Sequence, residues 1–253
     1  MSFFRPKQQA VISEASRAAW RTPEDVDSSV LALLSQANAM GEFVFSTDFS
    51  GYDATVKSEW QAVYWDMMKA LFQFQWHGLI EEWADNFKHI PLVAGPGEIY
   101  YGPHGVGSGS VITNDMDSDD HEVAQEAAAV ELDTVRHPLS QVQGDDGLLV
   151  LPGVRDAQAI EEVYGSFGFI ANAEKQFVGV DDALYLQKYY HLSWPAGGMY
   201  PTYRALSALV YPERFHDSEK WDERMETLRA LNILQNAKHH PCLLYTSPSP
   251  RDS

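Results

Sequence analysis

Residues 140–151 constrain the fold of this chain more than any other stretch. They read SQVQGDDGLLVL, in which a Gly-Asp-Asp-Gly turn separates two runs with apolar residues. This pattern is typical of a β-hairpin, and it carries two carboxylates, Asp145 and Asp146, at its tip. Because Asp-Gly is also ordinary turn chemistry, the hairpin alone does not establish a functional site.

A second expected strand also ends on a carboxylate. Residues 42–48 read EFVFSTD, with aromatic and β-branched residues leading to Asp48, and Asp53 follows after a short turn sequence. If the two strands lie side by side in one sheet, Asp48 comes within reach of Asp145 and Asp146. Three such carboxylates repel one another, and divalent cations relieve that repulsion. Oxygen-only ligands select Mg²⁺ or Mn²⁺ over zinc, and two such ions can support an in-line phosphoryl displacement.

The order of the remaining elements predicts the fold class. Apolar residues at steps of three or four indicate helices, and shorter β-branched or aromatic runs bounded by Gly and Pro indicate strands. We expect helices at residues 56–74, 79–87, 110–132 and 156–168, strands within 90–105, 175–180 and 183–192, short helical pieces within 3–40, and helical structure over 200–239 with a break at 211–212. The order β-α-α-β-α-β predicts an α+β architecture of the split βαβ kind, an antiparallel sheet with helices on one face.

Composition limits the class of protein and its partners. The 253 residues contain 45% hydrophobic residues, which indicates a globular chain, and neither a membrane-length apolar run nor a signal peptide is found. The net charge of −18 argues against tight binding of nucleic acid by itself. The single cysteine, Cys242, excludes a disulfide framework. It begins a segment, residues 242–253, that resembles a translated sequencing adapter; the alternative is a Ser/Pro tail.

The Gly-rich loop before the helix expected at 110–132 is a second candidate site. A loop that leads into a helix N-terminus presents N–H groups to an anion. Small polar side chains follow on the first turns, and the stretch contains Ser108, Gly109, Thr113, Asn114 and Asp117. The alternative is a flexible loop followed by a capped helix. Residues 115–126 also match the acidic positions of a calcium-binding EF-hand loop, but Asp120 stands where that loop needs Gly, so we reject this reading.

Five segments in order resemble motifs A to E of the palm of viral RNA-dependent RNA polymerases. They read DFSGYD, SGSVITNDMDS, GDD, ANAEKQ and LYLQKYYH, and residues 200–241 look like the start of the thumb of picobirnavirus-like enzymes. The resemblance implies a palm at residues 43–190, the start of the thumb at 191–241, and a remnant of the fingers or of the fingers–palm connection at 1–42.

The resemblance also implies roles for individual residues. Asp48 and Asp145, assisted by Asp146, would hold two Mg²⁺ or Mn²⁺ ions, and Lys175 would protonate the pyrophosphate leaving group. Otherwise Lys175 is a solvated surface lysine. A nucleotide- and ribose-binding set would comprise Asp53, Ser108, Gly109, Thr113, Asn114 and Asp117. Many relatives have Asn where this chain has Asp117. An ionised Asp117 can accept hydrogen bonds but cannot donate them, so it would need a donor such as the 2′-OH or Asn114.

The resemblance further implies the partners. They are RNA template, primer or nascent strand, nucleoside triphosphates and a basic fingers segment of the same polymerase, which we expect to be missing here. The expected place is the host cytoplasm or the virion interior, without membrane contact. Two alternatives stay open: a reverse transcriptase-like palm, and a catalytically silent acidic module for interaction or calcium binding.

Overall fold

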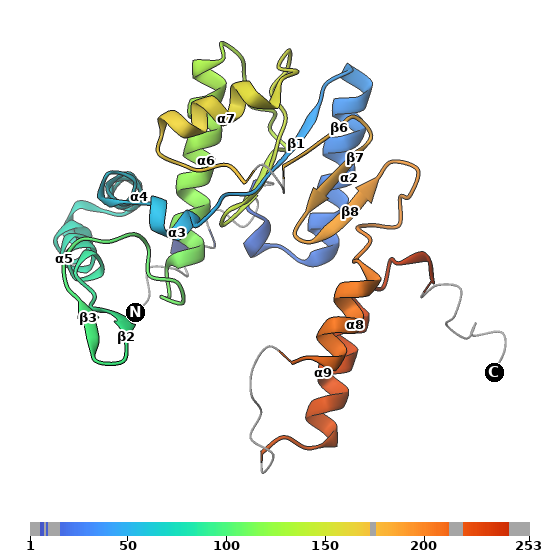
Figure 1. The fold of residues 1–253 in the computed structure, drawn as a ribbon. Coiled ribbons are helices and arrows are strands. Elements are labelled where there is room, and N and C mark those ends of the chain that lie inside the picture. The colour runs from blue at the N-terminus through green and yellow to red at the C-terminus, as the bar shows by residue number, and fades with distance from the viewer. Residues whose placement is uncertain (1–5, 8, 10–15, 173–175, 213–219, 243–253) are drawn as a thin grey trace.

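A four-stranded antiparallel sheet with the order β4-β5-β1-β6 organises the molecule. The computed structural model describes residues 6–7, 9, 16–172, 176–212 and 220–242 (Figure 1). The strands are β1 (Val44–Thr47), β4 (Gln141–Gln143), β5 (Asp146–Leu149) and β6 (Phe177–Gly179). This arrangement confirms the predicted α+β fold class with its antiparallel sheet, and β4 and β5 form the predicted hairpin. Its turn is shorter than expected, because Asp146 and Gly147 already pair with β4 and only Gly144 and Asp145 connect the strands.

One face of the sheet is covered by helices, as predicted. Helices α6 (Thr113–Glu131) and α7 (Ala157–Ser166) lie against it, and α3 (Tyr52–Thr55), α4 (Ser58–Leu71) and α5 (His77–Lys88) pack beyond α6 (Figure 1). Successive strand residues point to opposite faces, so Phe45 and Leu149 enter this core. The remaining elements on this side are η2 (Phe74–Trp76) and a hairpin of β2 (Leu92–Gly95) and β3 (Glu98–Tyr100).

The opposite face of the sheet is also covered, which the sequence reading did not anticipate. The helix α2 (Pro23–Met40) and the hairpin β7 (Asp182–Tyr185) and β8 (Lys188–His191) pack on it around Val44 and Leu148. Because both faces are covered, all four residues of β1 are buried, the polar Ser46 and Thr47 included. The short helical pieces expected within residues 3–40 are largely one long helix that begins at a Thr22 N-cap. The predicted boundary between residues 42 and 43 separates α2 from β1, which share this core.

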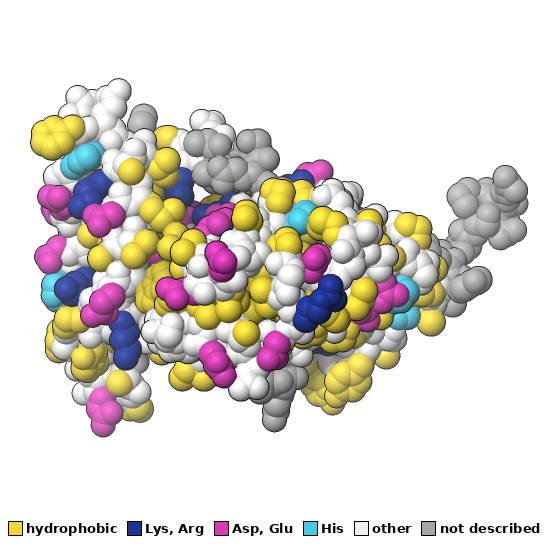
Figure 2. Space-filling model, turned by 90° about the horizontal axis from the view of Figure 1, so that it is seen from above, with side chains coloured by type: hydrophobic (Ala, Val, Ile, Leu, Met, Phe, Trp, Pro, Cys, Tyr) yellow, Lys and Arg dark blue, Asp and Glu magenta, His cyan; other side chains and the backbone are white. Residues whose placement is uncertain are grey.

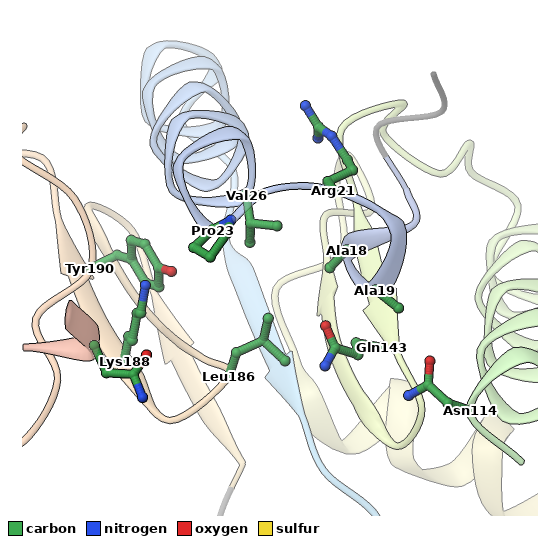
Figure 3. A pocket seen from close by; sticks show the side chains of 11 residues that line it. Ala18, Ala19, Arg21, Pro23, Val26, Asn114, Gln143, Leu186, Lys188 and Tyr190 are labelled. Atoms are coloured by element: carbon green, nitrogen blue, oxygen red, sulfur yellow. The ribbon is translucent and has the colours of Figure 1, made fainter. Parts of the chain in front are cut away.

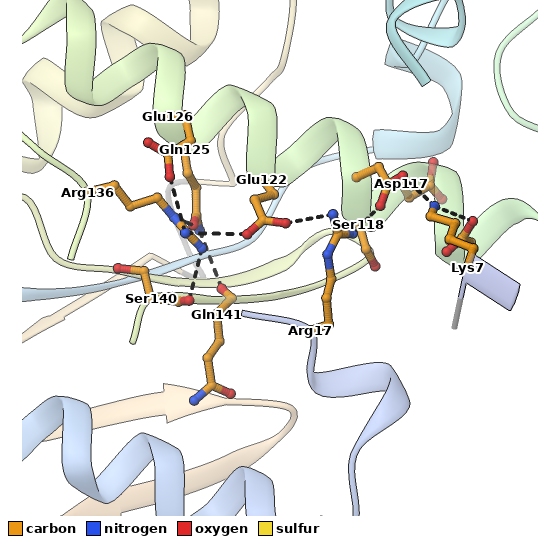
Figure 4. Close-up of polar contacts among 12 residues, drawn as sticks. Lys7, Arg17, Asp117, Ser118, Glu122, Gln125, Glu126, Arg136, Ser140 and Gln141 are labelled. Atoms are coloured by element: carbon orange, nitrogen blue, oxygen red, sulfur yellow. Dashed lines mark hydrogen bonds and ion pairs between the residues drawn. The ribbon is translucent and has the colours of Figure 1, made fainter. Parts of the chain in front are cut away.

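Helix α6 has a polar buried face. Lys7 Nζ lies 2.7 Å from Asp115 Oδ2, and Arg17 Nη1 lies 2.5 Å from Asp119 Oδ1. Arg136 Nε donates to Gln125 Oε1 at 2.7 Å (Figure 4). All three cationic side chains are buried, so each offsets carboxylates or amides that would otherwise be buried unpaired.

The C-terminal part of the described chain is helical, as predicted. Helices α8 (Thr202–Val210) and α9 (Glu223–Asn236) pack against each other. In the N-terminal part of the chain, the 3₁₀ turn η1 (Ala18–Trp20) contacts β4. Helix α8 ends just before the predicted break at residues 211–212. None of the helices in the described residues is both long and apolar enough to cross a membrane.

Candidate active site

The pairing of β1 with β5 brings the predicted carboxylates to one edge of the sheet. In this register Thr47 stands opposite Gly147, so Asp48 continues beyond β1 beside the turn that carries Asp145. A Cβ atom on Gly147 would lie 2.5 Å from Thr47 Oγ1. Only glycine therefore lets the two strands approach this closely without displacement of a neighbour.

The carboxylates open into one cavity of about 450 Å³. Its lining includes all three predicted metal ligands together with side chains that the sequence reading did not select. Arg204 enters from α8, and Gln187 comes from the β7–β8 turn. Leu186 and Gln187 have φ angles of 49° and 63°, which residues other than glycine adopt at an energetic cost. No turn signal such as Gly or Asn marks this position in the sequence.

The proposed proton donor Lys175 lies outside the described residues, but the chain on both sides of it is fixed to Asp48. Asn172 N donates to the Asp48 carbonyl at 2.9 Å, and Asn172 Nδ2 lies 3.3 Å from Asp48 Oδ1. Gln176 Nε2 donates to the same carbonyl at 3.1 Å. Asn172 and Gln176, the described residues on either side of Lys175, are therefore both held at Asp48.

Three of the predicted ribose-binding residues come together beyond these carboxylates. Asp53, in the first turn of α3, accepts a hydrogen bond from the Ser108 hydroxyl, and the Asp117 side chain lies close to it. The Gly-rich loop is tied to the same place, because Val106 N donates to the Asp53 carbonyl at 2.7 Å. A Cβ on Gly105 would lie 2.2 Å from that carbonyl oxygen, so glycine is required for this close approach.

The other three members of the predicted set lie apart from this trio. Thr113 Oγ1 donates to the Gly107 carbonyl at 2.8 Å and thereby fixes the loop to the start of α6. Gly109 is exposed and has a φ of 88°. Asn114 lines a different cavity, described below. A role for these residues toward the nucleotide stays a prediction.

The chain matches a known protein family over most of its length. The family model of the viral RNA-dependent RNA polymerases matches residues 3–238. The chain belongs to this family. The potential RNA-dependent RNA polymerase of a human picobirnavirus (strain Human/Thailand/Hy005102/-) is 36% identical over 231 residues, which are 88% of this chain and 42% of that protein.

Solved polymerase structures agree with this family membership. The crystal structure of the RNA-dependent RNA polymerase of a human picobirnavirus superposes with a TM-score of 0.84 and 34% identity, over 94% of this chain and 46% of that one. An insertion-loop deletion mutant of such an enzyme gives the same TM-score and identity, with 48% of its chain covered. The chain thus spans less than half the length of these polymerases.

The oxygen donors at the cavity fit the divalent ions that membership in this polymerase family implies. In this structure the described donors are not arranged as a complete metal site. Asp48, Asp145 and Asp146 are oxygen donors, and neither His nor Cys lines the cavity. In the part of the chain that the structure describes, no group of three or more His, Cys, Asp or Glu side chains is arranged so that it could hold an ion. Ion binding here would therefore require movement of the carboxylates toward one another.

Asp117 is buried beside another carboxyl group. Its side chain lies close to Asp53, and only 3% of the residue is exposed. Burial, followed by the neighbouring Asp53 and then Asp145, raises the pKa of Asp117 to about 8. Asp117 is therefore protonated at neutral pH and can donate a hydrogen bond, as the amide of Asn would.

The calcium-binding alternative finds no support. Residues 115–126 lie within the helix α6, whereas an EF-hand site needs a loop there. Within this segment, Asp115 and Asp119 form buried ion pairs with Lys7 and Arg17. Family membership likewise does not favour the reverse transcriptase-like alternative.

A second cavity lies on the other side of the hairpin turn. It has a volume of about 420 Å³, and its lining runs from α2 and β8 to Gln143 and Asn114 (Figure 3). Two basic side chains contribute to it, but both have partners. Lys188 Nζ lies 3.0 Å from Asp27 Oδ1, and Arg21 Nη1 donates to Ser29 Oγ at 2.6 Å.

Proposed function

We propose that this chain supplies the palm and the first part of the thumb to template-directed RNA synthesis by a viral polymerase. The observation that carries the proposal is the pairing of β1 with β5, which directs Asp48 and the Asp145–Asp146 turn into one cavity. Membership in the viral RNA-dependent RNA polymerases supports it. The proposed partners are RNA template, the growing strand, nucleoside triphosphates and a basic fingers segment.

The reaction joins a nucleotide to the 3′ end of the growing strand. The 3′-hydroxyl oxygen forms a bond to the α-phosphorus of the triphosphate, and the bond to pyrophosphate breaks. Asp48 and Asp145, with help from Asp146, would hold two Mg²⁺ or Mn²⁺ ions. When bound, such ions would supply Lewis-acid stabilisation to the attacking and leaving oxygens. Lys175 donates the proton that pyrophosphate takes up.

The ribose is selected by the cluster around Asp53. Asp117 carries a proton near neutral pH beside Asp53, and the Ser108 hydroxyl donates a hydrogen bond to the Asp53 side chain. Such a cluster can exchange hydrogen bonds with a 2′-OH, and a deoxyribonucleotide leaves these groups unpaired. Synthesis takes place in the host cytoplasm or the virion interior under this proposal.

The test is the loss of catalysis without loss of RNA binding. In the polymerase that contains this chain, Asp48→Asn or Asp145→Asn should lower primer extension by at least about a thousandfold, because the ions lose an essential ligand. Asp146→Asn should have a smaller effect. RNA affinity should stay close to that of the wild type.

The matched control is Asp156→Asn. Asp156 is an exposed N-cap on α7, and Asn caps a helix equally well. This variant should retain full extension activity. Substantial activity in Asp145→Asn would contradict the assignment of the metal ligands.

A further inference from the structure

Two side chains of α6 hold both backbone polar groups of Gly144, the first residue of the Gly-Asp-Asp-Gly turn. Gly144 N donates to Ser118 Oγ at 2.9 Å, and His121 Nδ1 lies 2.9 Å from the Gly144 carbonyl oxygen. Ser118 Oγ donates its own proton to the Asn114 carbonyl at 2.6 Å, so its lone pairs serve Gly144. Residues three apart in a helix share a face, which lets Ser118 and His121 act on one peptide unit.

The other nitrogen of His121 reaches the strand that carries Asp48. His121 Nε2 lies 3.5 Å from Thr47 Oγ1, and Thr47 directly precedes Asp48. A carbonyl oxygen only accepts, so Nδ1 carries the proton and Nε2 is the acceptor for the Thr47 hydroxyl. Burial lowers the pKa of His121 to about 4, which keeps the ring neutral and maintains this pattern at neutral pH.

The ring of His121 has little room to move. Its centroid lies 5.0 Å from that of Phe49 and 5.9 Å from that of Tyr52, and the side chain is fully buried. On the hairpin side, a Cβ on Gly147 would lie 2.6 Å from His121 Cε1. A tilt of this ring would therefore displace the hairpin that carries Asp145.

We propose that His121 and Ser118 are positioning residues, which fix the Asp145–Asp146 turn relative to Asp48 through Gly144 and Thr47. The same helix carries Asp117, so one rigid element sets the distance between the ribose cluster and the metal carboxylates. This inference rests on the proposed function, because it concerns ligands of the proposed ions. A purely structural role would instead mean that the two side chains only satisfy buried backbone groups.

The experiment measures the affinity of the 253-residue chain for Mn²⁺ alone, by electron paramagnetic resonance of the unbound ion. His121→Phe keeps an aromatic ring in the pocket and removes the N–H donor. His121→Asn loses the ring and keeps an N–H donor at the δ position. Outer-shell partners of metal ligands contribute about 10–100-fold to metal affinity, so we expect a loss of that size in His121→Phe. His121→Asn should retain most of the affinity.

Ser118→Ala provides an independent variant that removes a single buried atom. It should weaken Mn²⁺ binding, because Gly144 N loses its acceptor. The matched control is Ser28→Ala, since the Ser28 hydroxyl also bonds the carbonyl four residues before it but is exposed on α2. This control should bind Mn²⁺ like the wild type. Ser118→Ala also decides the test if His121→Phe fails to fold, as judged by circular dichroism.

Asp145→Asn distinguishes a failure of the proposed metal site from a failure of the positioning role. If Mn²⁺ binding does not depend on Asp145, the proposed metal site is wrong and the positioning role falls with it. If binding depends on Asp145 but Ser118→Ala binds like the wild type, or His121→Phe binds as well as or better than His121→Asn, only the positioning role is overturned.

Discussion

At the scale of single residues, the titration of Asp117 links nucleotide choice to pH. Its pKa of about 8 means that Asp117 is protonated below this pH, where it can donate to Asp53, and ionised above it. Two adjacent carboxylates would then repel each other and disturb the ribose cluster.

The polymerase that contains this chain should therefore discriminate less well between ribo- and deoxyribonucleotides at pH 9 than at pH 7. The measurement is the ratio of kcat/KM for a ribonucleotide and the matching deoxyribonucleotide. Asp117→Asn carries no titrating proton, so its ratio should be independent of pH over this range. A wild-type ratio that does not fall with pH would contradict this role of the Asp117 proton.

The titration of Asp120 should affect the stability of the folded chain, and not the chemistry of the candidate site. It is fully buried, neither carboxyl oxygen has a hydrogen-bond partner within the described residues, and burial raises its pKa to about 9. Between about pH 4 and 9 the folded chain holds a proton that the unfolded chain has released. Stability is therefore lost as the pH rises through this window.

Asp120→Asn should remove this dependence and stabilise the chain. The gain should grow with pH, by at most about 1.4 kcal/mol per pH unit. Urea unfolding at pH 5 and pH 8 measures it, with Asp156→Asn as an exposed control that should show no such trend. An equal gain at both pH values would show that Asp120 is ionised in the folded chain.

At the scale of elements, the hairpin of β4 and β5 depends on a close approach to α6 and β1. Gly147 lies against Thr47 and His121, and an added methyl group would overlap both. A helical glycine, Gly165 in α7, has nothing within 4 Å of the position of a Cβ.

The two glycine positions should respond to alanine with opposite signs. Gly147→Ala should destabilise the chain by about 1–3 kcal/mol through overpacking. Gly165→Ala should stabilise it by about 0.5–1 kcal/mol, because alanine is the better helix former. Equilibrium unfolding in urea tests both, and a neutral Gly147→Ala would show that the strand pair can separate without cost.

At the scale of the whole molecule, the distribution of charge opposes RNA binding by this chain alone. The net charge is −18, and three buried cations, Lys7, Arg17 and Arg136, are engaged by acidic or amide side chains of α6. On the face drawn in Figure 2, Lys and Arg side chains stand among acidic and apolar ones. The described Lys and Arg side chains form no continuous basic stripe on this face.

The 253-residue chain should therefore bind single-stranded RNA weakly, and the affinity should depend little on salt because few counterions are displaced. It should not extend a primer with Mg²⁺ or Mn²⁺. Fluorescence anisotropy over a salt series and a primer-extension assay measure these outcomes. Tight binding with a steep salt dependence would contradict this reading, as would extension that Asp145→Asn abolishes.

Much of the architecture could be predicted because its signals are local. The turn at residues 144–147, the strand that ends before Asp48 and the helical period of α4 each report their own structure through side-chain spacing. Their order along the chain gave the antiparallel sheet and placed Asp48 beside Asp145. The Gly-rich loop likewise predicted the start of α6 to within a few residues.

What the sequence left open concerns neighbours that are distant in the chain. Helical spacing shows that α2 has an apolar face, but not that the second face of the sheet receives it. His121 and Ser118 looked like ordinary helix residues, since only the packed hairpin brings Gly144 to them. The protonated state of Asp117 depends on burial against Asp53, and burial is a property of the tertiary structure. Local pattern determined the elements and the residue types at the site, whereas long-range packing decided their partners and charges.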